Sequence, residues 1–127
     1  MELVALVISL ALLEFVVFGI LVGRARGLYG VKAPAISGHE VFDRYFRVHY
    51  NTMELLIVFV PSIWFFGQYV SPQWAAGLGA IYLVGRIVYF RGYVADPAKR
   101  EIGFSMSMLP TVALLLGALI GAGRTLI

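Results

Sequence analysis

The feature that most constrains this chain is a series of apolar segments, each long enough to cross a lipid bilayer. They cover residues 3–22, 42–69, 73–95 and 97–121. A helix of about 20 apolar residues crosses the hydrocarbon core of a bilayer. Because unpaired backbone groups cannot face lipid, each segment is expected to be helical. The sequence therefore predicts an all-α, four-helix integral membrane bundle that forms a single domain over residues 1–127.

Composition agrees with a membrane protein and excludes several kinds of site. The chain is 61% hydrophobic and 13% charged, whereas a soluble domain is about 25% charged. Cysteine is absent, which rules out disulfides, thiolate metal ligands and cysteine nucleophiles. His39 and His49 have no second ligand three or four residues away, so no metal site is predicted. A net charge of +3 is too small to indicate a nucleic-acid partner.

Local signals set the expected ends of the segments. The basic segment 23–27 is expected to end the first span, and a loop rich in glycine and proline follows it. Ser71 begins a short turn before the third span. Asp96 followed by Pro97 is typical of a helix N-cap with proline at the first helical position. Pro61 is expected to kink the second span.

Lysine and arginine are distributed unevenly over the loops, which predicts the orientation in the membrane. Basic residues gather in cytoplasmic loops of membrane proteins. The second loop, residues 68–73, has no charge. We therefore expect the first and third loops to be cytoplasmic and both termini to lie outside, in a multi-pass membrane protein. The first and third loops are flanked by Arg24, Arg26, Lys32, Arg44, Arg47, Arg91, Lys99 and Arg100.

Two polar faces interrupt the apolar spans at their cytoplasmic ends. Arg47, Asn51 and Glu54 are spaced so that they share one face of the second span. The third span carries a similar face, and both faces should lie at the same membrane level. Guanidinium, amide, carboxylate and phenol groups together suit a zwitterionic ligand with several carboxylates. The face on the third span comprises Arg86, Tyr89 and Tyr93.

The same side chains also permit a purely structural interpretation. A buried network of ion pairs, such as Glu54 with Arg86, would hold the helices together without binding a ligand. Arg100 lies in the first turn of the fourth span, where a basic residue can act as a cytoplasmic anchor. Arg26 and Arg24 allow the same interpretation.

Glu14 lies in the middle of the first span, between Leu13 and Phe15. An ionisable residue within a membrane is costly and often functional. One interpretation is a substrate site in a small proton-coupled multidrug-type transporter. The other is an interhelical hydrogen bond or ion pair, including one across a subunit contact.

Two segments resemble the signatures of a known family. Residues 42–54 resemble the helix-two motif of the MAPEG superfamily, the membrane-associated proteins in eicosanoid and glutathione metabolism. Residues 82–93, with Arg100 beyond them, resemble the helix-three motif. The resemblance covers most of the chain and is closest to bacterial members and to the branch of microsomal glutathione transferases and leukotriene-forming synthases. It therefore implies a location in a bacterial inner membrane.

The resemblance implies a homotrimer with a glutathione site at each subunit interface, near the cytoplasmic surface. Glutathione would be the co-substrate, and a hydrophobic electrophile would enter from the membrane lipid. Arg100 matches the arginine that stabilises the glutathione thiolate, and Arg26 is the second candidate for this catalytic role. The residues expected to form the glutathione site are Arg47, His49, Asn51, Glu54, Arg86, Tyr89 and Tyr93. In the resemblance Arg86 matches a buried supporting position, and His49 replaces a glutamine that some relatives have at this position.

The implied reaction is glutathione transfer, with reduction of lipid hydroperoxides as a further possibility. Gly27 stands where the leukotriene-forming branch has a second arginine, which argues against leukotriene formation but not against glutathione binding. Leu55 and Ile57 also depart from the eukaryotic pattern. A non-catalytic, lipid-binding member of the family is the remaining alternative.

Overall fold

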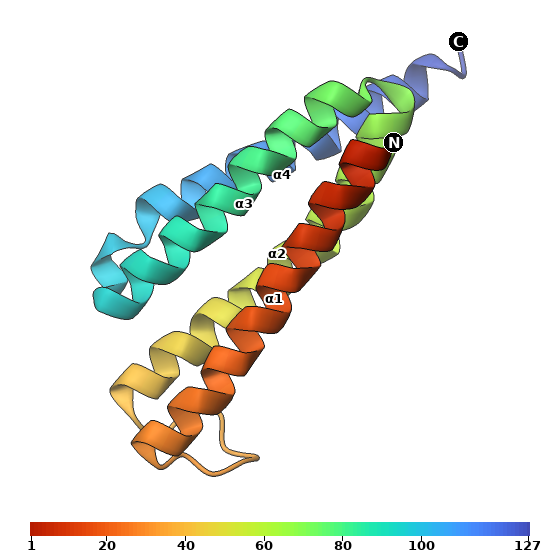
Figure 1. The fold of residues 1–127 in the computed structure, drawn as a ribbon. Coiled ribbons are helices and arrows are strands. Elements are labelled where there is room, and N and C mark those ends of the chain that lie inside the picture. The colour runs from red at the N-terminus through yellow and green to blue at the C-terminus, as the bar shows by residue number, and fades with distance from the viewer.

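The computed structural model describes all residues, 1–127, and contains four long helices and no strand. Figure 1 shows α1 beside α2 and α3 beside α4, so the helices form two pairs that pack on each other. The prediction of an all-α four-helix bundle is therefore confirmed. The elements are α1 (Glu2–Tyr29), α2 (Glu40–Tyr69), α3 (Pro72–Ala95), a 3₁₀ turn (Pro97–Lys99) and α4 (Glu101–Arg124).

The helices alternate in direction, so the connections gather at two ends. The first loop and the α3–α4 connection lie at one end, whereas both termini and the α2–α3 turn lie at the other (Figure 1). Three helical segments are long and apolar enough to cross a membrane: α1, α2 and residues 97–124. The 24-residue α3 carries Arg86 and Arg91, and its crossing of the membrane stays a prediction.

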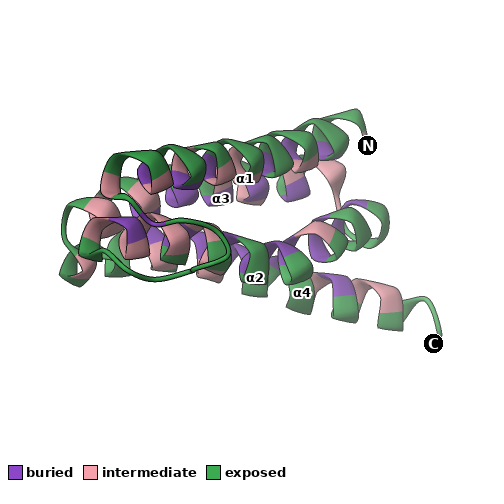
Figure 2. Cartoon of the chain, turned by 90° about the horizontal axis from the view of Figure 1, so that it is seen from below, coloured by how far each residue is buried: buried purple, intermediate pink, exposed green.

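Each helix turns a narrow apolar stripe toward the others. On α1 the buried residues recur every three or four positions, as the helical repeat of 3.6 residues requires. Figure 2 shows buried positions on the facing sides of the helices and exposed positions on their outer sides. Many of the outer side chains are leucine, valine and isoleucine, which suits contact with lipid. The stripe on α1 consists of Val4, Val7, Ala11, Phe18, Val22 and Ala25.

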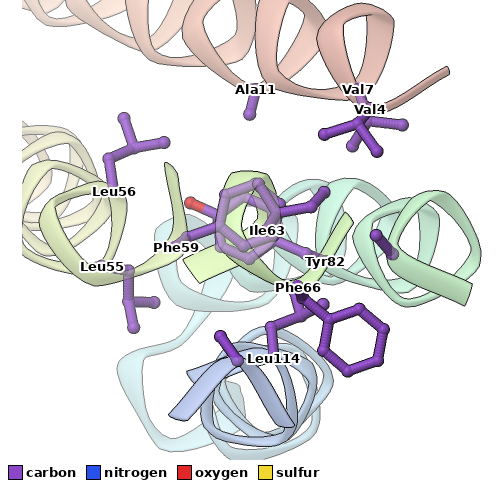
Figure 3. Close-up of a cluster of buried hydrophobic side chains, with 12 residues drawn as sticks. Val4, Val7, Ala11, Leu55, Leu56, Phe59, Ile63, Phe66, Tyr82 and Leu114 are labelled. Carbon is purple, nitrogen blue, oxygen red and sulfur yellow. The ribbon is translucent and has the colours of Figure 1, made fainter. Parts of the chain in front are cut away.

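The largest buried cluster joins all four helices near the middle of the bundle. Phe59 on α2 stacks on Tyr82 of α3, with ring centroids 3.8 Å apart. Leu114 of α4 and Ala11 of α1 belong to the same cluster. Figure 3 shows these side chains converging from the surrounding helices. Packing of this kind fixes the relative rotation of the helices, and therefore determines which polar groups face one another.

One predicted helix end is wrong, and one predicted N-cap is present. α1 does not end at residue 22 but continues through the basic segment to Tyr29, and Gly30 ends it in the left-handed conformation with φ 68°. Ala25 is buried and the arginines beside it are good helix formers, so the helix extends past Gly27. Asp96 caps the 3₁₀ turn by accepting a bond from the Ala98 N–H, 3.1 Å away.

Two prolines lie inside helices, and a serine caps the start of α3. Pro61 and Pro110 lie within α2 and α4, and both helices continue through them. Ser71 caps α3, where its side chain accepts a hydrogen bond from the Trp74 N–H. The short α2–α3 connection therefore agrees with the turn predicted from the sequence.

Candidate functional site

A buried guanidinium organises the polar residues at the loop end of the bundle. Arg86 on α3 is 0% exposed. Its Nε donates to Ser107 Oγ on α4 at 2.9 Å, and its Nη1 donates to two acceptors on α2. Those acceptors are Asn51 Oδ1 at 2.8 Å and Thr52 Oγ1 at 3.2 Å. One side chain therefore ties three helices together and fixes the amide of Asn51.

The ion pair considered between Glu54 and Arg86 is not present. The two ion pairs in the chain join the N-terminus to Glu2 and Arg44 to Glu40. Glu54 is exposed on the outer side of α2, and the hydrogen-bond partners of Arg86 are uncharged. The structural interpretation is therefore correct in that Arg86 joins helices, but it was wrong about the partner.

Two tyrosines extend the polar face of α3 beyond Arg86. The guanidinium carbon of Arg86 lies 4.4 Å from the ring centroid of Tyr89, a cation–π contact. The rings of Tyr89 and Tyr93 are 5.6 Å apart. The predicted face of Arg86, Tyr89 and Tyr93 therefore forms as a continuous row.

A hollow of about 380 Å³ opens in front of these residues, between α2, α3 and the start of α4. Arg47 and Arg100 are exposed and lie on its rim. Arg100 Nη1 donates to the Pro97 carbonyl at 3.0 Å, and a guanidinium has five N–H donors, so others are free for a ligand. The hollow is lined by Arg47, Asn51, Tyr89, Tyr93, Arg100, Glu101 and Phe104.

Besides the buried Arg86, three predicted site residues lie outside this hollow. Arg26 donates to the carbonyl of Ala35 at 2.6 Å and its guanidinium lies 4.9 Å from the Phe42 ring, so it holds the first loop. His49 stacks on Phe15 of α1, with ring centroids 4.3 Å apart. Glu54 faces outward from α2. Within one subunit, none of the three reaches the lining of the hollow.

Four residues of the site were not predicted. Glu101 and Phe104 line the hollow, and Phe104 follows Arg100 by four residues, so helical spacing places both on one face. Thr52 and Ser107 bind Arg86. For Thr52 and Ser107, the sequence signal was a small polar residue on the inward face of an apolar helix. No group of three or more metal-ligating side chains comes together anywhere in the chain.

Gly103 allows α4 to pass directly against the backbone of Tyr89. A methyl group at this position would overlap the N and Cα atoms of Tyr89. We expect Gly103→Ala to push α3 from α4 and to lower the midpoint of thermal unfolding in detergent. The matched control is Gly123→Ala, since Gly123 has open space around it. Equal midpoints for the two variants would contradict this close packing.

Comparison with known proteins agrees with the architecture. The sequence model of the MAPEG family matches residues 4–120. An uncharacterized protein of Synechocystis sp. is 47% identical over 116 residues, which cover 91% of this chain and 85% of that protein. Human microsomal glutathione S-transferase 2 is 39% identical over 103 residues, 80% of this chain and 70% of its own. Guinea pig (Cavia porcellus) leukotriene C4 synthase is 35% identical over 98 residues, 77% of this chain and 65% of its own.

Proposed function

The chain belongs to the MAPEG family, and on that premise we propose that it is a membrane-bound glutathione transferase. The reaction is conjugation of glutathione to hydrophobic electrophiles. The observation that carries the proposal is the hollow around which Arg47, Asn51, Tyr89 and Arg100 gather. Relatives named as glutathione transferases and as a leukotriene C4 synthase support the choice of thiol.

The groups around the hollow match the polar groups of glutathione. Arg47 offers a two-pronged donor to a carboxylate, and guanidinium–carboxylate pairs are among the stronger charge-assisted hydrogen bonds. Asn51 offers an amide whose oxygen is already bound by Arg86, so its NH₂ group remains to donate. Tyr89 and Tyr93 add phenol hydroxyls. Glutathione has two carboxylates, an ammonium and two peptide groups, which this set of donors and acceptors can bind.

Arg100 is the residue that we assign to thiol activation. The nucleophile is the thiolate, and a free thiol has a pKa of about 8.5. A guanidinium beside the sulfur favours the charged form. Each unit by which the pKa falls corresponds to about 1.4 kcal/mol. The thiolate then forms a bond from sulfur to an electrophilic carbon, and the leaving group departs with its electron pair.

Reduction of a lipid hydroperoxide is a second reaction open to the same thiolate. The sulfur would attack the outer peroxide oxygen, so that an alcohol leaves and a sulfenic acid forms. A second glutathione would convert this to the disulfide and water. Both reactions use the same site residues, and the electrophile would reach the thiolate from the lipid along the apolar outer faces.

A homotrimer would explain the site residues that do not meet within one subunit. The hollow is open, and Glu54 and Arg26 lie on other surfaces of the same end of the bundle. In an assembly with the binding site between subunits, Glu54 of one subunit would reach the ammonium of glutathione held by the next. His49, packed against α1, would support the α2 segment that carries Arg47 and Asn51.

The proposed location is a bacterial inner membrane, with the hollow at the cytoplasmic side. The basic residues flank the first and third loops, and both loops lie at the end of the bundle that carries the hollow (Figure 1). Glutathione would then enter from the cytoplasm, where it is dissolved. The electrophile would be a membrane-soluble molecule.

Glutathione binding to the detergent-purified protein tests the proposal directly. We expect isothermal titration calorimetry to detect binding to the wild type, and Arg47→Ala to weaken it about tenfold, the effect of losing roughly 1.4 kcal/mol of binding free energy. Arg124→Ala is the control, since Arg124 is exposed at the opposite end of the bundle. Absence of binding to the wild type would refute glutathione as the substrate.

A further inference from the structure

Glu14 occupies a position on the inward stripe of α1. It follows the buried Ala11 by three residues and precedes the buried Phe18 by four, which is the spacing of one helix face. Its side chain is half-buried, and its Oε1 atom is buried without a hydrogen-bond partner. The carboxyl therefore points into the bundle at a position where the other stripe residues are apolar.

Two contacts between α1 and α3 fix the level at which Glu14 lies. A Cβ atom at Gly79 would meet the side chain of Val7, and the ring of Phe18 stacks on that of Phe90 with centroids 5.0 Å apart. Gly79 follows Val7 by the same number of residues as Phe90 follows Phe18, and α1 and α3 run in the same direction. The same interval places Glu14 level with Arg86.

Two further buried polar groups at this level lack partners. The hydroxyl of Tyr82 and the Nη2 of Arg86 are both buried without a hydrogen bond, and both residues are 0% exposed. The guanidinium carbon of Arg86 lies 5.9 Å from the Tyr82 ring. Figure 3 shows Tyr82 among the side chains of the buried cluster, where its ring stacks on that of Phe59. An unsatisfied buried polar group costs several kilocalories per mole, so three at one level point to a common partner.

Charge balance also connects Glu14 with Arg86. A fully buried guanidinium requires a counter-charge or a complete set of hydrogen bonds. The acceptors that Arg86 contacts are uncharged. Of the 7 acidic residues in the chain, Glu14 alone lies on the inward face of a helix at this level. The others are Glu2, Glu40, Asp43, Glu54, Asp96 and Glu101.

We propose that Glu14, Tyr82 and Arg86 form an internal water-binding site, with Glu14 as the counter-ion of Arg86. One or more ordered waters accept from Arg86 Nη2 and donate to the Glu14 carboxylate and the Tyr82 oxygen. A buried water typically has two to four polar partners.

The water site lies directly behind the candidate glutathione site. Arg86 binds Asn51 through Nη1, and Asn51 lines the hollow. The carboxyl in the middle of α1 is thereby connected to the hollow through one water layer and one guanidinium. The water site does not depend on which thiol the hollow binds.

A double-mutant cycle followed by thermal unfolding in detergent tests the shared site. We expect Glu14→Gln and Tyr82→Phe each to lower the unfolding midpoint, and the double variant to lower it by clearly less than the sum of the two shifts. Neighbouring groups that share a partner show such non-additivity. Tyr69→Phe is the control, since Tyr69 is exposed at the far end of α2. Additive shifts would overturn the shared site.

A map of the wild type at a resolution that shows ordered water provides a test without any variant. The proposal expects density within hydrogen-bond distance of the Glu14 carboxylate, the Tyr82 hydroxyl and Arg86 Nη2. A dry cluster, or a direct contact between the carboxylate and the guanidinium with no water, would overturn it.

Discussion

Replacing Arg100 with alanine is expected to lower the turnover of glutathione conjugation by about two orders of magnitude. Preorganised donors at a developing or bound anion contribute effects of this size, and two units of thiol pKa correspond to roughly 100-fold in the thiolate equilibrium. The affinity for glutathione should stay within several-fold of the wild type, because the carboxylates and ammonium are held by other residues. Steady-state kinetics with a chromogenic aryl halide, combined with calorimetry, measures both quantities.

Two further variants make the Arg100 result specific. Arg100→Lys keeps a positive charge near the sulfur and should recover part of the turnover. Arg91→Ala removes an exposed arginine of α3 that does not line the hollow, so it should leave turnover unchanged. If Arg100→Ala weakens glutathione binding as much as it slows the reaction, Arg100 binds the substrate and the thiolate assignment is wrong.

Replacing Arg86 with methionine is expected to destabilise the bundle by about 2–5 kcal/mol. The side chain is fully buried and donates to Asn51, Thr52 and Ser107 on two neighbouring helices. Removing it leaves those acceptors without their donor, and losses of this size follow when one member of a buried polar network is removed. Denaturant or thermal unfolding in detergent measures the change.

The Arg86 variant should also alter the hollow. Without the guanidinium, Asn51 loses the bond that orients its amide, so glutathione should bind more weakly to the fraction of the variant that remains folded. Arg91→Met is the matched control, since Arg91 lies on the same helix but is exposed. An unfolding midpoint equal to that of the control would contradict the central role of Arg86 in joining the helices.

Helical spacing was sufficient to predict most of the hollow. Arg47 and Asn51 are four residues apart on α2, and Tyr89 and Tyr93 are four apart on α3, so one rotation of each helix brings both pairs to the same place. The apolar stripes determine that rotation. The sequence also predicted that the polar faces of α2 and α3 lie at the same depth in the membrane, because both are at the ends of spans on the same side of the membrane.

Contacts that depend on loops or on exact helix rotation could not be predicted in this way. Glu54 was considered as the partner of Arg86, but α2 turns Val48, Thr52 and Leu55 inward, and Glu54 lies on the opposite side. Arg26 was grouped with Arg100 from the resemblance. Its actual contact with Ala35 depends on the path of the first loop, which no periodic pattern specifies.

The residues at which the helices begin and end could not be predicted from hydrophobicity either. That pattern marks where a chain leaves the lipid, not where its helix stops. α1 therefore continues to Tyr29, past the last apolar residue of the predicted span. A 3₁₀ turn at Pro97–Lys99 precedes α4, which begins at Glu101. Arg100 lies between the two, at the rim of the hollow.

A titration of the bound thiol tests the central claim most directly. Detergent-purified protein is mixed with glutathione, and ultraviolet absorbance of the thiolate is followed across pH for the wild type and Arg100→Ala. The account predicts a thiolate signal at neutral pH in the wild type that is lost in the variant. A wild type that binds glutathione without forming the thiolate at neutral pH would contradict a glutathione-activating enzyme.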